Sequence, residues 1–350
     1  MIRLGLCCKF HREPIAFKTT TAAALARLPR ARQLEKLAAL ALANAGALQR
    51  ALAYCAAHGI GAFRVNSQIL PVKTHPQQAY AVGDLPESAA IVAAFEACGR
   101  FARRHGLRLT FHPDQFILLS APDPEIVRRS VMDLIYQAEV AEWIHADVIN
   151  IHAGGGYGDK PAALARLAAA LASLPAGVRA RLTLENDDRI YTPADLLTFC
   201  EKTGTPFVYD VHHHRCLPDG LTVSAVTARA RATWDREPLL HVSSPKEGYG
   251  SSRPGPHHDF IDPDDFPEEW RTLDATIEVE AKAKEVAIER LALGEREIHD
   301  GGMVVRFMPN GSFEGAQVVL RSRTGSRLRI VSDPARGGAR IETGPLEAFP

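Results

Sequence analysis

The residues best suited to chemistry lie in the stretch DVHHHR at positions 210–215. It follows a short apolar run, residues 206–209, and buried strands more often end in turn residues such as Gly or Asn. Asp210 and His213 form a D-x-x-H pair, whose carboxylate and imidazole suit zinc, manganese or iron better than calcium or magnesium. A polar loop with solvated histidines is the simpler alternative, so a metal site needs support from the rest of the chain.

The scaffold for such a site is predicted by alternating strand-like and helix-like segments, the pattern of parallel βα units. Eight strand-like runs predict an α/β fold, a (β/α)8 TIM barrel, whose active sites lie at the carboxyl ends of the strands. The predicted strands are residues 3–8, 61–65, 108–111, 147–151, 181–184, 206–209, 239–242 and 276–279. The predicted helices are residues 34–58, 88–105, 124–145, 160–173, 222–234 and 281–292, with one more that opens at Thr192.

Metal-ligand side chains close six consecutive predicted strands. One histidine at a strand end is more often a structural group than a ligand, but six ligand-type residues in succession point to a metal site. Two further histidines, from the loops after strands six and seven, join them. The full set is His112, His152, Glu185, Asp210, His213, His241, His257 and Glu280. One zinc ion needs four protein ligands at most, so eight ligands with three carboxylates imply two or three divalent ions.

The chemistry of such a cluster suits displacement at phosphorus. Divalent ions lower the pKa of the attacking water and neutralise both the entering and the leaving oxygen. Phosphodiester hydrolysis is therefore the favoured reaction class, and the predicted catalytic residues are Glu185, Asp210, His213 and Glu280. A metal-dependent sugar isomerase or small-molecule hydrolase on the same barrel stays open as the alternative.

Chain length, net charge and cysteine content limit the possible domain number, partners and location. A chain of 350 residues is long enough for one α/β barrel or two average domains. Lys plus Arg equals Asp plus Glu at 41 each, so global charge gives no support to nucleic-acid binding. Six cysteines without a C-x-x-C pair fit reduced thiols. Without a leader pattern or an apolar run of 18 residues, we expect a cytoplasmic protein, no membrane partner and a monomer.

Several motifs occur in order from residue 1 to about residue 292. The longer ones are FHPDQF at 111–116, NIHAGGGYGDK at 150–160, LENDD at 184–188, DVHHHR at 210–215, HVSSPKEG at 241–248 and VEAKAKE at 279–285. Together they resemble the UV damage endonuclease family. The resemblance implies a metal-dependent barrel that nicks double-stranded damaged DNA on the 5′ side of UV photoproducts. It implies three divalent ions, commonly manganese, at the same eight ligand positions; we expect two or three ions, with Mn²⁺ preferred over Zn²⁺ or Mg²⁺.

The resemblance also implies residues that recognise the substrate. Gln115 and Phe116 would wedge into the duplex while the damaged dinucleotide is flipped out, and Asn66 is a further expected substrate contact. From the residues alone, packing of Phe116 in a loop is the simpler alternative. Three departures from the family stand out: Leu239 replaces a lysine whose carbamate helps to hold the metals, Phe116 replaces the usual tyrosine of the wedge, and Cys7 replaces a frequent tyrosine. A metal-binding barrel that has lost catalysis is therefore a third alternative.

The pattern changes after about residue 296. Residues 303–342 alternate strand-like runs with turn pairs, which predicts a small antiparallel β-meander. We therefore expect two domains, a metal-dependent endonuclease-like barrel over residues 1–295 and a β-rich extension over 296–350. The motifs of the resemblance do not reach the extension, and the sequence assigns it no function.

Overall fold

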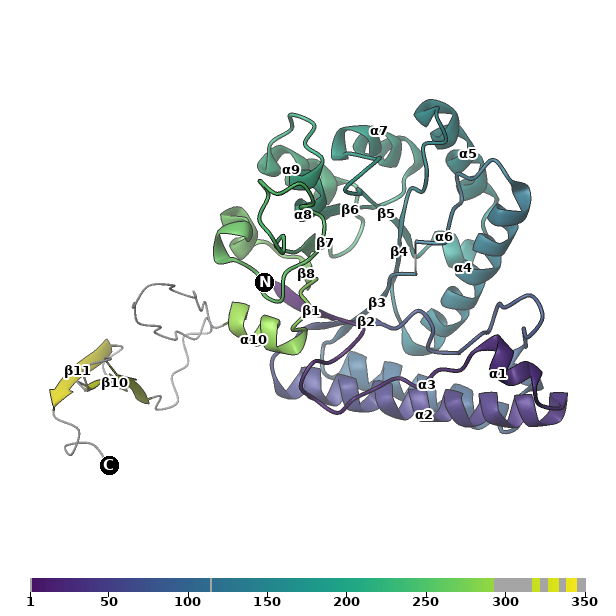
Figure 1. Ribbon diagram of the computed structural model, residues 1–350, viewed down its shortest axis with the longest axis horizontal. Helices are drawn as coiled ribbons and strands as arrows, with labels where there is room; N and C mark the ends of the chain where they lie inside the picture. Colours follow the sequence, from purple (N-terminus) through teal and green to yellow (C-terminus); the bar gives the residue numbers. More distant parts are fainter. Residues whose placement is uncertain (1, 114, 293–316, 322–326, 334–337, 345–350) are drawn as a thin grey trace. The chain divides into compact units, whose positions relative to one another are not determined.

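The barrel is confirmed by the computed structural model, which describes residues 2–113, 115–292, 317–321, 327–333 and 338–344. Eight parallel strands close into a barrel in chain order, each paired with the next and β8 with β1 (Figure 1). The strands are β1 (Arg3–Cys7), β2 (Ala62–Val65), β3 (Arg108–Phe111), β4 (Val148–His152), β5 (Leu182–Glu185), β6 (Phe207–Asp210), β7 (Leu239–Val242) and β8 (Thr276–Val279).

Every predicted strand matches an observed one to within one residue at each end. Three of them, β4, β5 and β6, run one residue further than predicted, through His152, Glu185 and Asp210. The sheet ladder is made by the backbone, so it continues through polar residues that an apolar pattern leaves out. The three ligand candidates are thus part of the sheet itself.

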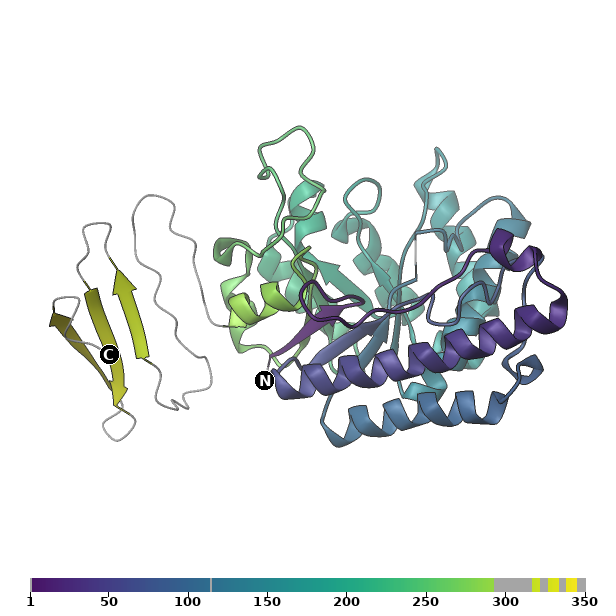
Figure 2. The ribbon, with the colours of Figure 1, turned by 60° about the horizontal axis from the view of Figure 1, so that its bottom comes forward.

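The helices surround the barrel, and α2 and α3 lie side by side along one flank (Figure 2). The sequence did not predict α1, which Thr21 caps by accepting from Ala24 N. It also did not predict α8, which holds the three histidines of DVHHHR, so the alternative of a polar loop is wrong. The helices are α1 (Ala22–Ala26), α2 (Arg30–Ala57), α3 (Ser88–Arg104), α4 (Pro124–Ile144), α5 (Lys160–Ser173), α6 (Ala176–Arg179), α7 (Pro193–Thr203), α8 (Val211–Cys216), α9 (Val223–Ala232) and α10 (Glu285–Ala292).

Side chains alternate across each strand between the barrel interior and the helix layer. Phe63, Phe111 and Tyr209 are fully buried and face the helices, whereas their neighbours Arg64, His112 and Asp210 face the interior. The interior is unusual for such a barrel, because charged residues stand where branched apolar residues dominate. An apolar cluster of Val148, Val208 and Leu239 remains nearer its amino end.

The second part of the chain is a three-stranded antiparallel sheet in the order β11-β10-β9, formed by β9 (Gln317–Arg321), β10 (Arg327–Asp333) and β11 (Gly338–Gly344). It confirms the β-meander for these strands. The predicted stretch 303–316 and the boundary between 295 and 296 lie outside the described residues, so the boundary stays a prediction. Across the part of the chain that is described, no helix has the length and apolar character to cross a membrane.

Candidate metal centre

The candidate ligands meet because parallel strands in register end at one edge of the barrel. His152 pairs directly with Glu185 across β4 and β5, and Asp210 pairs with His241 across β6 and β7. His112 and Glu280 follow β3 and β8 by one residue each. Six separate βα units therefore deliver side chains to the same level of the interior.

The helix α8 explains the D-x-x-H spacing. Asp210 is the N-cap of this helix, and its Oδ1 accepts from the backbone N of His213 at 2.8 Å. The same spacing turns the imidazole of His213 back toward the cap, so that Nδ1 lies 3.6 Å from Asp210 Oδ2. One carboxylate oxygen thus holds the helix, and the other faces the centre.

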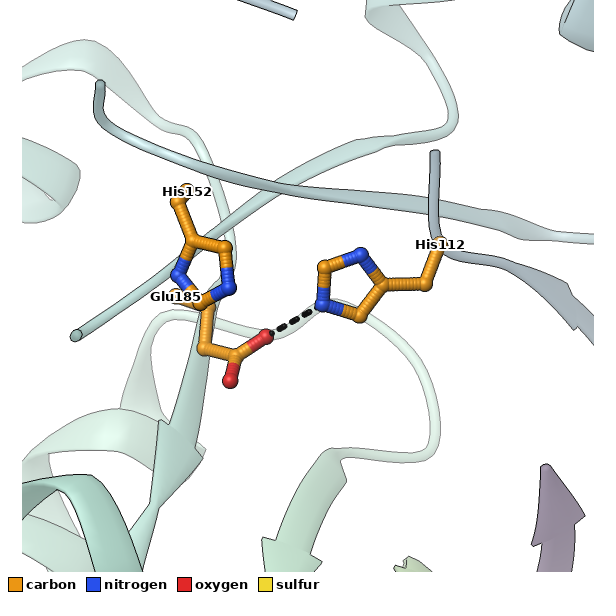
Figure 3. Close-up of side chains that lie close together, drawn as sticks. All are labelled: His112, His152 and Glu185. Atoms are coloured by element: carbon orange, nitrogen blue, oxygen red, sulfur yellow. Dashed lines mark hydrogen bonds and ion pairs between the residues drawn. The ribbon is translucent and has the colours of Figure 1, made fainter. Parts of the chain in front are cut away.

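Glu185 lies in the middle of the cluster, fully buried, and its two oxygens face different histidines. Oε2 contacts His112 Nε2 at 2.9 Å, as Figure 3 shows with His152 alongside. Oε1 lies 3.3 Å from His213 Nδ1 and 3.2 Å from His241 Nδ1. A carboxylate with this surrounding is suited to bridge two cations.

Seven of the eight predicted ligands fall into three overlapping groups, in each of which the ligand atoms lie within 4.8 Å of one another. The eighth, His257, lies in the loop after β7 and has its Nδ1 3.7 Å from Glu280 Oε2. The prediction that the eight side chains come together is therefore consistent with the geometry. The three groups are His112, His152 and Glu185; His112, His241 and Glu280; and Glu185, Asp210 and His213.

Four buried ligand atoms lack a hydrogen-bond partner among the described residues: His152 Nδ1, Glu185 Oε1, Asp210 Oδ2 and His241 Nδ1. Buried polar atoms are nearly always paired, because leaving one unpaired costs about 1–3 kcal/mol. Four such atoms facing one centre, two imidazole nitrogens and two carboxylate oxygens, form a donor set that divalent cations accept. The residues present therefore fit the metal ions that the sequence predicts.

Known proteins match this chain over most of its length. The model of the UV-endonuclease UvdE family matches residues 2–306. The chain belongs to the UV-endonuclease UvdE family. Membership confirms the predicted enzyme class, an endonuclease of DNA repair, and decides against the isomerase alternative.

Two curated relatives and one solved structure align with most of this chain. The UV DNA damage endonuclease of Deinococcus radiodurans is 37% identical over 308 residues, which cover 83% of this chain and 95% of that protein. The UV DNA damage endonuclease of Bacillus velezensis is 36% identical, covering 78% and 87%. The crystal structure of SacUVDE superposes with a TM-score of 0.74 at 26% identity, covering 83% of this chain and 96% of that one.

Charges in the centre of this UvdE-family barrel hold one another ionised. Burial alone would raise the pKa of Glu185, but His241 and His152 beside it hold that pKa well below its ordinary value. Burial would lower the pKa of His241, but the Glu185 carboxylate outweighs it and the pKa is raised to about 10. Burial would also lower the pKa of His213, but Asp210 and Glu185 outweigh it and raise this pKa well above its ordinary range. A cation that binds here competes with protons for these nitrogens.

Of the three expected substrate-binding residues, Gln115 lies at the mouth of the centre. A cavity of about 710 Å³ opens there, lined among others by Gln115, His152 and His213. Phe116 is 75% exposed, so the alternative in which it packs in its loop is wrong. Asn66 follows β2 and is half-buried, and its Oδ1 accepts from Gln68 N at 2.8 Å in a local turn.

The remaining histidines of DVHHHR have partners elsewhere. His214 Nδ1 lies 2.7 Å from the Tyr209 hydroxyl, and its Nε2 lies 2.9 Å from Asp219 Oδ1, in the helix layer. His212 lies 3.1 Å from both the Tyr249 hydroxyl and the Gly255 carbonyl. His212 therefore ties α8 to the loop that carries His257.

Sequence reasoning missed the polar residues one layer below the ligands. Asn150 donates to Glu185 Oε2, and Asn186 donates to the Asp210 carbonyl at 2.9 Å. Glu278 and Arg64 form a buried ion pair, bonded also to Thr110. Strand alternation could have identified Glu278, because it lies two residues before Glu280 and so shares its face.

Proposed function

We propose that this protein incises double-stranded DNA immediately 5′ of UV photoproducts, using two or three divalent metal ions. The observation that supports it most strongly is the convergence of His and carboxylate side chains on one buried centre in which four of their atoms have no hydrogen-bond partner among the described residues. Family membership supplies the substrate class, DNA, and the reaction class, phosphodiester hydrolysis.

The proposed ligands are the eight predicted from the sequence: His112, His152, Glu185, Asp210, His213, His241, His257 and Glu280. Bound divalent ions would supply a lowered pKa for the attacking water and neutralise the charge that develops on the phosphate oxygens. Glu185 would hold metal through both oxygens, because each of them faces a different set of proposed ligands. Asp210, His213 and Glu280 complete the proposed catalytic group around it.

Manganese is the proposed ion, with zinc and magnesium as alternatives. The mixed imidazole and carboxylate set suits borderline transition metals, whereas magnesium prefers oxygen ligands and retained waters. No cysteine belongs to any ligand group among the described residues, which removes the ligand that most favours zinc in structural sites. The fit of Mn²⁺ therefore rests on ligand chemistry and on the family resemblance together.

Recognition of the lesion is proposed for the residues at the mouth. Phe116 follows the proposed ligand His112 by four residues and Gln115, which lines the cavity, by one, and its exposed ring is the proposed wedge. A ring inserted between bases must overcome a few kcal/mol of stacking, which is lowest where the stack is already damaged. Gln115 and Asn66 are the proposed polar contacts. The monomeric state and the cytoplasmic location stay predictions.

The test is incision of an end-labelled duplex that carries one pyrimidine dimer, with Mn²⁺ present. We expect a single nick immediately 5′ of the dimer, reduced more than about 100-fold in His213→Ala, because loss of a ligand exceeds the loss of a group that only supports one. The control His105→Ala, at the exposed end of α3, should nick as the wild type does. Folded, manganese-loaded protein that leaves the dimer duplex intact would overturn the proposal.

A further inference from the structure

Two buried charged residues of the barrel interior, Arg64 and Glu278, have no role in the site as predicted from the sequence. Their side chains are 9% and 1% exposed, and Arg64 Nε donates to Glu278 Oε2 at 2.5 Å. The hydroxyl of Thr110 donates to the other oxygen, Oε1. A buried ion pair is often no more stabilising than apolar residues of similar volume, so its purpose is better sought in what it contacts.

The pair contacts two of the proposed ligands from below. Glu278 Oε2 lies 3.1 Å from His241 Nε2, and Arg64 Nη1 lies 2.6 Å from Glu280 Oε1. The opposite edge of each ligand faces the cluster: His241 Nδ1 lies 3.2 Å from Glu185 Oε1, and Glu280 Oε2 lies toward His257. Each ligand is therefore held at one edge and presented at the other.

The hydrogen-bond chemistry defines which nitrogen of His241 is held from below and which one faces the cluster. Glu278 is an acceptor and requires a proton on Nε2, whereas Arg64, whose Nη2 lies 3.0 Å from Nε2, has only donors and would require a lone pair there. Arg64 already has the Glu278 carboxylate as a charged acceptor, which is the stronger bond. Nε2 therefore keeps its proton, and Nδ1, which faces the Glu185 carboxylate, is the nitrogen that a cation can take in exchange for a proton.

Gly5 leaves space for this pair, and Leu239 on the neighbouring strand has no polar group that could replace it. Gly5 on β1 pairs with Glu278, and a Cβ at Gly5 would lie 3.0 Å from Glu278 Cγ. Leu239, two residues before His241 on the same face of β7, packs with Val148 and Val208. β7 thus contributes an apolar side chain where the family resemblance implies a carbamate, and the carboxylate beneath the centre comes from β8.

We propose that Arg64 and Glu278 are a positioning pair, which fixes His241 as an Nδ1 ligand and Glu280 as a carboxylate ligand of the metal centre. The proposal rests on the proposed function of the centre as a metal site. Groups that hold a ligand by its far edge fix its orientation, and their loss lowers metal affinity about 10–100-fold. Neither residue touches the substrate in this account.

The experiment is a Mn²⁺ titration of the full chain followed by electron paramagnetic resonance, which reports free manganese without relying on incision. Glu278→Gln keeps the volume and removes the charge, and Arg64→Met removes the donors. We expect each to weaken manganese binding about 10–100-fold. Arg64→Lys, which keeps one charged donor, should recover part of that loss.

The matched control is Arg108→Met. Arg108 is as buried as Arg64 and pairs with Asp147 at 2.8 Å, but it lies at the other end of the interior and contacts none of the ligands. Its loss should lower the Tm of the metal-free protein while manganese affinity stays within about twofold. The proposal is overturned if Glu278→Gln and Arg64→Met bind manganese as tightly as the wild type, or if Arg108→Met weakens binding as much as they do.

Thr110→Val keeps the test decisive if Arg64→Met does not fold. It removes only the hydroxyl that holds Glu278 Oε1, and we expect a loss of manganese affinity smaller than tenfold but outside the range of the control. Wild-type protein that binds no manganese would overturn the proposed function together with this inference. Wild-type protein that binds manganese, with variants that bind it equally well, would overturn the inference alone.

Discussion

The two ends of the barrel interior differ in how their polar side chains are paired. At the amino end, Arg108 pairs with Asp147 at 2.8 Å, Arg3 pairs with Glu237 at 2.9 Å, and Leu239 lies in an apolar cluster. At the carboxyl end, four buried atoms of the candidate ligands have no hydrogen-bond partner among the described residues. The charges at the amino end thus support the fold, whereas atoms at the carboxyl end are available to a cation.

The largest effect is expected from Asp210→Asn. The amide keeps the oxygen that caps α8 and loses the charge on the atom that faces the centre. We expect incision and manganese affinity to fall more than about 100-fold, whereas the metal-free protein keeps the α8 cap and loses only its ion pair with His213. Asp147→Asn is the matching change at the amino end. Loss of this half-exposed carboxylate should lower the free energy of unfolding by about 1 kcal/mol and leave incision unchanged. A variant Asp210→Asn with normal manganese affinity would contradict the comparison.

Leu239→Ala should have the opposite effects to Asp210→Asn: a large loss of stability and little change in manganese affinity. The side chain is fully buried against Val148 and Val208, so its truncation should lower the free energy of unfolding by about 2–5 kcal/mol. Manganese affinity, measured below the new Tm, should stay within about threefold of the wild type. Chemical denaturation together with a manganese titration measures both quantities. A large loss of metal affinity would mean that the apolar end takes part in the centre.

Phe116→Ala tests the rim above the carboxyl end. Because the ring is 75% exposed, its removal should change the free energy of unfolding by less than about 0.5 kcal/mol. Preference for a dimer duplex over an undamaged one should fall about 10-fold, since the wedge compensates for a few kcal/mol of unstacking. Met132→Ala, another exposed apolar side chain, is the control and should keep the preference. Competition binding with the two duplexes measures it.

The smallest effect expected is a pH dependence of the metal-free protein. The pKa of His241 is raised to about 10, and that of His213 is also raised, so their protonation stabilises the fold fully below their ordinary pKa. This contribution is lost as the pH rises from about 6.5 toward 10, and Tm in EDTA should fall across that window. Manganese affinity should rise over the same window as the competing protons leave. In His241→Gln both slopes should decrease; unchanged slopes would show that other groups produce them.

The scaffold could be predicted from the sequence because apolar runs mark its strands, and all eight lie within one residue of prediction. The meeting of the candidate ligands could be predicted because strand ends meet at one edge of a parallel barrel. α8 was missed because Asp210 ends a strand and begins a helix at the same residue. Glu278 and Arg64 were missed because a polar residue within a strand shows its purpose only when the opposite side of the barrel is known.

The most direct test of the central claim, that the carboxyl end of the interior is a multinuclear metal centre, is anomalous diffraction from crystals grown with Mn²⁺. The account predicts two or three manganese peaks, each within bonding distance of at least two of the eight ligands, with Glu185 between two of them. No peak among these residues in crystals that bind manganese elsewhere would contradict it.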